Sequence, residues 1–346
     1  MTLNISLLEA SDFDGWDKFV SSHPKGTFCH LSGWKSVIEI GAGQQCPYLV
    51  AKQDSLIVGI LPLTIKKHFI FGKALISNMF CVYGGAIAAD NAVANALYDH
   101  AWNFAMDHQL PVLEVRADVL EKTQGDDWIT SAGSATFKKQ LATTDEEQLL
   151  AIPRKQRAVV RKSLKNGLST DWTGDIDIFY DLYARSVLAL GTPVFPKKLF
   201  VALASVFGDA VQTQLTLGPD GRPVASLMSF YFNGTVMPYY AGGSALVRSL
   251  GAHDFMYYNL MLHARDRGCT FFDFGRSKVD SGPYKFKKNW GFEPTPLSYC
   301  FCSAPGVAQP NLSQQTGPFA VLSKVWKKLP LGVSKVLGPH LARHLG

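Results

Sequence analysis

The sequence predicts an α/β protein built from two similar domains. The chain has 346 residues, of which 47% are apolar, so it can bury two cores. The order hairpin, strand, helix, strand occurs twice along it. One offset relates the two copies: 158 residues separate Gly84 from Gly242, and 159 separate Glu114 from Asp273. A repeated order at a constant offset indicates an internal duplication.

The first half is expected to form two helices, a hairpin, a buried strand, an amphipathic helix and a short strand. In order these are residues 11–20, 33–40, 47–68 with a turn at Gln53-Asp54, 73–85, 91–108 and 111–116. Ser11 and Ser32 are typical helix-capping residues. Apolar residues at helical spacing, from Val93 to Phe104, predict that the long helix is amphipathic.

A capping box at Thr144 and Glu147 begins a short helix in the segment that connects the two halves. We therefore place the domain boundary near residue 145. Helices are expected after Pro153 and over residues 176–191 and 196–208. The second sheet then follows, over residues 211–243.

Two turn signals divide the second sheet. Asp220-Gly221 and Asn233-Gly234 each separate apolar runs, and both are expected to form two-residue hairpin turns. A helix stopped by Gly268 and a strand over residues 269–277 complete the second copy.

Charge is divided unequally between the halves. Residues 1–150 carry 11 Lys/Arg and 17 Asp/Glu, and residues 151–346 carry 23 and 11. The second half therefore has a net charge of +12, which favours an anionic partner over plain solubility charge. Arg154, Arg157, Arg161 and Lys165 form one basic helical stripe, suited to a phosphate-bearing substrate or tRNA, or else a solvated face.

Several classes of protein are excluded or disfavoured. The sequence contains no run of 18 apolar residues, so no membrane span is expected. The N-terminal residues lack the basic start of a signal peptide. Six scattered cysteines suit a reducing cytoplasm, and Cys300-x-Cys302 has no second ligand pair, so no metal is expected. Catalysis by a Ser-His-Asp or Cys-His nucleophile is not indicated, and His253 has no motif context.

The segment from Asp273 to Glu293 is the most informative. Arg276 and four lysines flank glycines and aromatic side chains there, a composition suited to an anionic ligand or a surface loop. The alternation of Tyr284 and Phe286 fits a strand with one buried face.

With YYAGGS, ARDRG, FFDFGRS and GPYKFKKNWGFEP in this order, the chain resembles the FemAB family of aminoacyl- and acyltransferases. It is most similar to the branch associated with exosortase (PEP-CTERM) and exopolysaccharide loci. IPRKQRAVVRKSLKNGL, FCVYGG and the tail also match that branch. The resemblance implies two tandem GNAT-like (acyl-CoA N-acyltransferase-like) domains, over residues 1–145 and 146–305, and a basic amphipathic tail over residues 306–346. Members that build peptidoglycan bridges use aminoacyl-tRNA and carry a long helical arm, which this sequence lacks.

The resemblance also implies a site. Phe286 and Lys287 match the Phe-Lys at the family's transfer site, where a cation would stabilise an oxyanion. Asp273 is the nearest carboxylate for proton removal, or else caps a turn. The expected substrate-binding residues are Tyr239, Tyr240, Arg276, Tyr284, Lys285, Tyr83, Trp34 and Lys35.

Donor binding is expected at a degenerate CoA-type loop, where Arg248 and Gly251 fit and His253 replaces a small residue. No permanently bound cofactor is expected, and the donor is acyl-CoA or aminoacyl-tRNA. The expected function is transfer of an acyl or aminoacyl group to an amine of a cell-envelope or exopolysaccharide precursor, with a nucleotide-linked acceptor as one option. The alternatives are an acyl-CoA-dependent acetyltransferase and a non-catalytic scaffold.

The C-terminal tail is basic and apolar. Residues 317–346 carry five Lys/Arg and no acid among Val, Leu and Trp326. Such a segment either packs on the second domain or contacts an anionic membrane, most readily through residues 330–346. A cytoplasmic protein with peripheral contact to the inner membrane face is the expected localisation.

Overall fold

The computed structural model describes residues 2–68, 71–117, 128–307 and 323–346, and these form two compact units. Unit 1 comprises residues 1–133, 297–313 and 341–346. Unit 2 comprises residues 134–296 and 314–340. The division differs from the expected domains: the chain passes between units at 133/134, and the tail is shared between them. Residues 308–322 of the expected tail lie outside the described residues.

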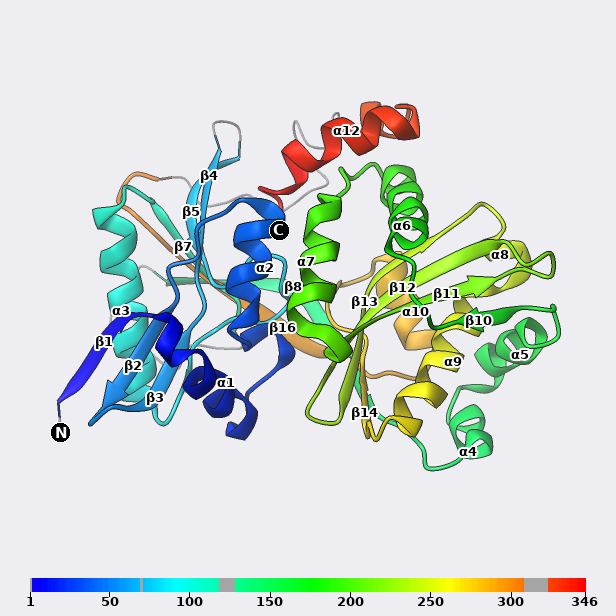
Figure 1. Ribbon diagram of the computed structural model, residues 1–346, viewed down its shortest axis with the longest axis horizontal. Helices are drawn as coiled ribbons and strands as arrows, with labels where there is room; N and C mark the ends of the chain where they lie inside the picture. The colour runs from blue at the N-terminus through cyan, green and yellow to red at the C-terminus, as the bar shows by residue number, and fades with distance from the viewer. Residues whose placement is uncertain (1, 69–70, 118–127, 308–322) are drawn as a thin grey trace. The chain divides into compact units, whose positions relative to one another are not determined.

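Unit 1 contains an antiparallel sheet of order β1-β2-β3-β6 (Figure 1). Its strands are β1 (Leu3–Leu7), β2 (Leu49–Gln53), β3 (Leu56–Leu61) and β6 (Ile87–Ala88). The connecting helices are α1 (Phe13–Ser22), α2 (Gly33–Ala42) and α3 (Asn91–Asp107). α3 packs on β2 and β3 through Val93, Leu97 and Ala101, so the predicted amphipathic helix is confirmed.

A second group of strands in unit 1 has the order β16-β7-β5-β4. These are β4 (Thr64–His68), β5 (Gly72–Ile76), β7 (Val112–Val115) and the part of β16 (Thr295–Ser303) that lies in this unit. The hairpin β4–β5 follows Pro62 directly. From the sequence, β3 and β4 were expected to form a single strand.

Unit 2 is built on a sheet of order β10-β11-β12-β13-β14-β9. The strands are β9 (Lys138–Gln140), β10 (Ser169–Asp171), β11 (Val211–Leu217), β12 (Pro223–Phe232), β13 (Thr235–Gly243) and β14 (Phe271–Asp273). The helices are α4 (Asp145–Leu150), α5 (Arg154–Ser163), α6 (Ile176–Leu190), α7 (Lys197–Phe207), α8 (Val247–Leu250), α9 (Ala252–Asp266) and α10 (Gly282–Asn289). β15 (Ser277–Lys278) pairs with the end of β8 (Trp128–Thr136).

The two units repeat one element order. A strand, two helices, two strands, a further strand, a helix and a strand run from β1 to β7 and again from β10 to β14, where the short helix α8 is added before α9. The first four strands also have matching positions across each sheet. Unit 1 differs by the inserted hairpin β4–β5. The repeated order agrees with the predicted duplication.

One of the two predicted hairpin turns is confirmed. Phe232 pairs with Thr235 across Asn233-Gly234, and both turn residues have positive φ, as a two-residue turn requires. The prediction at Asp220-Gly221 is wrong. There the amide of Gly218 donates to the carbonyl of Arg222, which leaves three loop residues, because Gly221 with φ 75° extends the turn.

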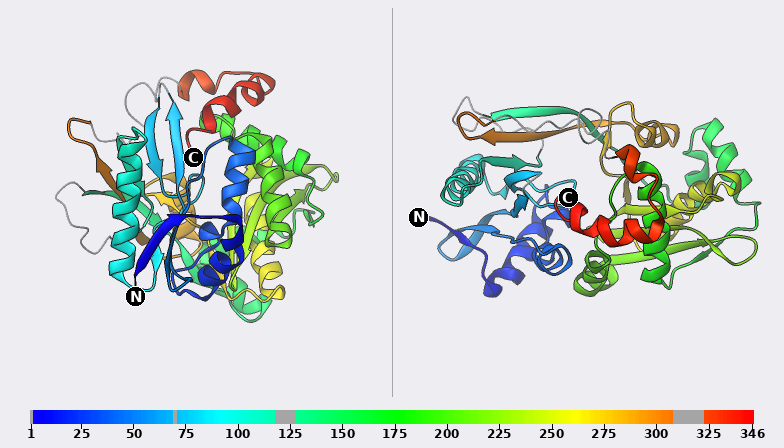
Figure 2. Two further views of the ribbon diagram at one scale, coloured as in Figure 1. Left: turned by 60° about the vertical axis from the view of Figure 1, so that its left-hand side comes forward. Right: turned by 90° about the horizontal axis from the view of Figure 1, so that it is seen from above.

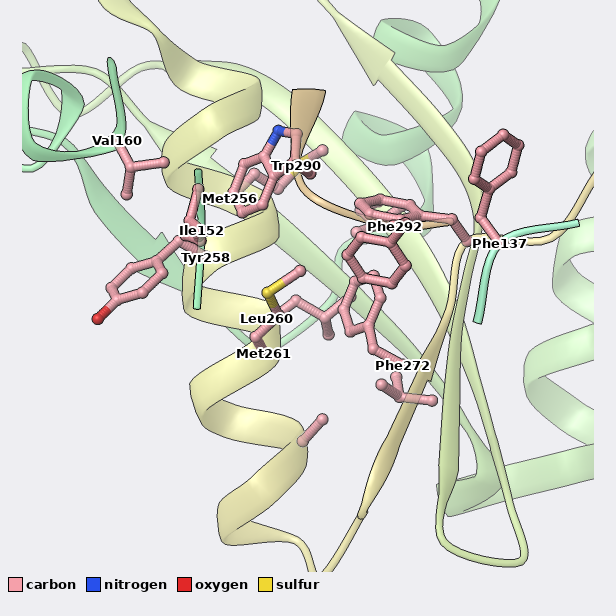
Figure 3. Packing of buried hydrophobic residues seen from close by; sticks show 14 of the residues in the cluster. Phe137, Ile152, Val160, Met256, Tyr258, Leu260, Met261, Phe272, Trp290 and Phe292 are labelled. Atoms are coloured by element: carbon pink, nitrogen blue, oxygen red, sulfur yellow. The ribbon is translucent and has the colours of Figure 1, made fainter. Parts of the chain in front are cut away.

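The core of unit 2 lies between α9 and one face of the sheet (Figure 3). Met256, Leu260 and Met261 of α9 meet Phe272, Trp290 and Phe292, all nearly fully buried. The other face of β12 turns towards α6, where the hydroxyl of Ser226 donates to the carbonyl of Phe179. The sheet therefore carries a helix layer on each face, and β13 and β14 lie between these layers.

Residues 282–289, expected as a strand, are the helix α10. Its N-terminus is fixed by Ser281, whose hydroxyl accepts the amide of Tyr284, and Pro283 occupies the first turn. Tyr284 and Lys287 are three residues apart and share the face towards Phe137. The alternation of Tyr284 and Phe286 was misleading because a short helix can bury aromatic residues on two adjacent faces.

Candidate active site

The candidate site lies where β13 and β14 diverge. The two parallel strands pair at Thr235–Phe271 and Val236–Phe272. β14 then ends at Asp273, whereas β13 continues to Gly243. The C-terminal half of β13 and the loop after β14 therefore separate. Such a divergence exposes main-chain groups of a strand to a ligand.

β13 has a β-bulge at Tyr239. Met228 of β12 pairs with Tyr240 and Ser229 pairs with Pro238, so Tyr239 is the extra residue of β13 between these two pairs. The ring of Tyr239 lies 4.7 Å from that of Phe230. Tyr240 is buried, and its ring centre is 5.1 Å from Phe200 of α7 and 5.8 Å from Tyr183 of α6. Both tyrosines lie on β13 within the diverging region.

The end of β13 approaches α6 very closely. A Cβ at position 242 would lie 2.3 Å from the Tyr183 nitrogen and 2.5 Å from the Leu182 carbonyl carbon. Beside it, the amide of Gly243 donates to the hydroxyl of Ser186 at 2.8 Å. Only glycine permits this approach at 242. The direction of β13 at the site is therefore fixed by α6.

Lys287 holds the loop that follows β14. Its ammonium donates to the carbonyls of Phe274 (2.7 Å), Gly275 (3.0 Å) and Arg276 (3.1 Å). Burial lowers the pKa of Lys287 from 10.5 to about 8, although the nearby Asp273 carboxylate opposes this shift. The lysine is thus a buried cation at the candidate site. In this ligand-free structure it orders the main chain of residues 274–276.

Asp273 caps the same loop. Its carboxylate accepts the amide of Gly275 at 2.7 Å, and Gly275 has φ 63°, so the turn is tight. The side chain is only 4% exposed. The structure therefore provides the turn-capping role that the sequence offered as the alternative to proton removal.

The other residues of the motif divide between the surface and the core. Lys285 and Arg276 are exposed, and Arg276 donates to the hydroxyl of Ser134 at 3.0 Å. Tyr284 packs edge-on against Phe137. Phe286 is half-buried and lies 5.6 Å from the ring of Tyr257. Lys285 and Arg276 are thus the more accessible groups of this motif.

The expected donor loop leads into the N-terminus of α9. Arg248 is exposed, and Gly251, with φ 64°, ends α8 and precedes α9. The first amides of a helix have no intrahelical acceptor and favour anions. Asp254 lies in this first turn, where burial raises its pKa. Its carboxylate accepts a hydrogen bond from the side chain of Gln156.

His253 and Tyr257 were not expected as site residues, but both lie near the diverging strands: the ring of Tyr257 is 5.1 Å from that of Phe274, in the loop after β14. A Cβ at Gly243 would lie 3.2 Å from Nε2 of His253. By distance and angle, this buried Nε2 has no hydrogen-bond partner within the described residues, but a main-chain interaction with Gly242 favours the protonated imidazole. Burial lowers the pKa of His253 from 6.5, which keeps the imidazole neutral at pH 7. The i, i+4 spacing of His253 and Tyr257 was the available signal.

Three expected substrate-binding residues belong to unit 1. Trp34 is completely buried and donates to the carbonyl of Phe28 at 3.0 Å, so its side chain offers no surface to a ligand. Lys35 pairs with Glu39 at 2.6 Å and with the carbonyl of Cys46. Tyr83 is half-buried beside Gly84, whose amide donates to the carbonyl of Arg116.

The basic stripe is confirmed as one face of α5. A hollow on unit 2 is lined by Arg154, Arg157, Ala158, Arg161, Lys162 and Lys165. None of its five cations forms an ion pair within the described part of the chain. This concentration of unpaired charge suits a phosphate-bearing ligand.

Among the described residues, no cluster of three or more His, Cys, Asp or Glu side chains is arranged to hold a metal ion. Cys300 and Cys302 are buried in β16, and all six cysteines are unbridged. Nor does any helix of the described chain have the length and apolar character needed to span a membrane.

Residues 154–288 match the family model described as "Acetyltransferase (GNAT) domain". This segment contains the diverging strands, α9, Asp273 and Lys287. No curated protein matches the sequence.

Solved structures extend the similarity over both units. The structure of FemX covers 86% of this chain and 96% of its own, with a TM-score of 0.66 and 16% identity. The structure of L-PGS from Bacillus licheniformis covers 94% of this chain and 99% of its own, with a TM-score of 0.58 and 9% identity. The structure of a tandem GNAT protein from the clavulanic acid biosynthesis pathway covers 89% of this chain and 100% of its own, with a TM-score of 0.56 and 15% identity.

These similarities establish the fold. The chain has an α/β fold of two tandem GNAT-like domains, and its second half carries the GNAT acetyltransferase match. Among the described helices, the longest is α3 with 17 residues. For residues 154–288, the class supported is that of GNAT-type acyltransferases.

Proposed function

We propose that the protein transfers an acyl or aminoacyl group to an amine of a cell-envelope or exopolysaccharide precursor. The observation that carries the proposal is the divergence of β13 from β14 beside the loop held by Lys287. Beyond Val236, β13 no longer pairs with β14 and can hold a donor in extended form. The buried ammonium supplies positive charge next to the transferred carbonyl.

The proposed reaction is nucleophilic acyl substitution. The amine nitrogen attacks the carbonyl carbon of a donor ester or thioester, and the carbonyl electrons move to oxygen. The resulting oxyanion collapses, the new C–N bond remains, and the bond to the donor oxygen or sulfur breaks. The amine proton passes to a base and then to the leaving group, so no oxidant or metal is required.

His253 supports this step better than Asp273, whose carboxylate already accepts the Gly275 amide. The imidazole is neutral, and its buried Nε2 lies beside Gly243. We expect His253→Gln to lower kcat about 100-fold while the KM for the donor changes less than threefold. The assay is steady-state kinetics across pH, and His263→Gln is the matched control. Unchanged kcat in His253→Gln would exclude the imidazole as base.

The donor is proposed to be anionic. The N-terminus of α9 with Arg248 and the stripe on α5 both favour phosphate. Acyl-CoA and aminoacyl-tRNA each carry phosphate and an activated carbonyl. In Arg157→Glu/Arg161→Glu, the KM for a donor held by α5 should rise at least tenfold, and the KM for the acceptor should not change.

One screen tests the function directly. Pure protein is incubated with acyl-CoA and aminoacyl-tRNA sets and with amine-bearing nucleotide-sugar or lipid-linked acceptors, and products are detected by mass shift. We expect one donor class to yield an amide product that the Lys287→Met variant does not form. If the donors remain intact and no amide forms in the full screen, the scaffold alternative replaces this proposal.

An acyl-CoA-dependent acetyltransferase is the second candidate. The diverging strands and the helix N-terminus at residue 252 favour it, because together they can hold an extended thioester and its pyrophosphate. Turnover with acetyl-CoA but not with aminoacyl-tRNA would select this candidate.

A further inference from the structure

The C-terminal helix α12 (Leu331–Ala342) packs on unit 2 by its small side chains. Ser334 is completely buried, and a Cβ at Gly338 would lie 2.9 Å from the Val194 nitrogen. Lys335 of α12 pairs with Asp181 of α6 at 2.5 Å. Figure 2 shows α12, in red, beside the green helices of this unit. These contacts fix which face of α12 is turned inwards.

The outward face of α12 is mainly apolar and also carries the exposed His340. Val333, Val336 and Leu337 are 40%, 66% and 48% exposed, and their spacing places them on one side of the helix. Val325, shortly before α12, is 57% exposed. A surface helix normally buries this stripe and exposes its small polar residues. The reversed arrangement indicates that the apolar side meets a partner.

Three exposed lysines precede α12 in the chain. Lys324, Lys327 and Lys328 are exposed, and none has an ion pair within residues 323–346 or the rest of the described chain. No acidic residue follows Glu293 in the sequence. We call these three lysines, with Val325, Val333, Val336 and Leu337, the tail surface.

We propose that the tail surface attaches the protein to anionic lipid bilayers. Apolar side chains accompanied by lysines complement a bilayer, in which acyl chains lie beneath negatively charged headgroups. Face-to-face pairing with a second copy would place lysine opposite lysine, which opposes association. Attachment is at the surface, through side chains. It is independent of the proposed transfer reaction.

Two tail residues that were candidates for membrane contact are engaged within the protein. Trp326 is only 4% exposed, so it packs within the protein and does not anchor in lipid. Lys335 is engaged by Asp181 and also lies over the ring of Tyr180. Because truncation would remove the buried Trp326, point substitutions of the tail surface give the clearer test.

The test is co-sedimentation of the full chain with phosphatidylcholine vesicles containing about 30% phosphatidylglycerol, at about 0.02 M and 0.5 M salt. We expect binding at low salt and release at high salt. Lys324→Gln/Lys327→Gln/Lys328→Gln should lower the partition coefficient on the order of 100-fold, because each lysine contributes a factor of about five and the three factors multiply. Val336→Ser/Leu337→Ser should lower it at least tenfold, because less apolar surface is buried.

Matched controls remove the same groups from unit 1. Lys18→Gln/Lys25→Gln/Lys73→Gln removes three exposed lysines, and Ile40→Ser/Leu56→Ser removes two exposed apolar side chains. Both controls should partition within about twofold of the unchanged protein. The proposal is overturned if the protein does not sediment at low salt, if it binds pure phosphatidylcholine equally, or if the tail-surface variants bind unchanged. Turnover of soluble substrates, measured in parallel, separates this result from the proposed function.

Discussion

Replacing Lys287 by methionine should lower kcat/KM for acyl transfer at least 100-fold. Methionine keeps the apolar stem beside Phe137 and Phe274 but removes the ammonium that binds three loop carbonyls. It also removes the positive charge available to an oxyanion, a loss that typically costs 10²–10³-fold. The measurement is steady-state kinetics with the donor that the screen identifies.

The matched control for this change is Lys288→Met, because Lys288 is exposed on the same helix. It should retain activity within about twofold. We expect Lys287→Met to lower the free energy of unfolding by about 1–3 kcal/mol, since the carbonyls of residues 274–276 lose their donor. Urea unfolding measures this, and full activity of a folded Lys287→Met protein would remove Lys287 from the mechanism.

The pH profile tests whether the charge itself is required. Burial lowers the pKa of Lys287 to about 8, so the ammonium is present below that pH and is lost as the pH rises through it. Activity that depends on the cation should therefore decline above pH 8. The residual activity of Lys287→Met should lack this alkaline limb. A rate that rises steadily to pH 10 in the unchanged protein would contradict a requirement for the charge.

Replacing Gly242 by alanine should destabilise unit 2 by about 3 kcal/mol or more. The added Cβ would meet main-chain atoms of Tyr183 and Leu182 at 2.3–2.5 Å, and main-chain atoms of a helix cannot rotate away. Either β13 or α6 must move, which displaces Tyr239 and Tyr240. We expect a lower midpoint in thermal unfolding together with a loss of transfer activity.

Gly332→Ala provides the control, since a Cβ there meets nothing within 4 Å and the residue lies in α12. It should be neutral or stabilising by up to about 1 kcal/mol, because alanine favours a helix. A Gly242→Ala protein that unfolds at the same temperature as the unchanged one would mean that β13 and α6 tolerate separation.

The sequence by itself determined the repeated α/β organisation and many element ends. The capping box at Thr144 and the turn at Asn233-Gly234 are local arrangements, formed between residues within a few positions of each other. Periodicity likewise located α3, whose apolar stripe must face a core. The loop length at Asp220-Gly221 was not predicted, because a glycine with positive φ also fits the last position of a three-residue loop.

Tertiary structure alone decided what the motif residues do. The sequence identified Lys287 as a cation, but its three carbonyl acceptors lie 11 to 13 residues away and meet it only after α10 folds back on the loop. Likewise, packing against α6 makes Gly242 indispensable, and docking of α12 by Ser334 and Gly338 turns its valines outwards. A sequence pattern records which side chains are apolar or charged. Which of them are buried, and against which atoms, depends on contacts between distant segments.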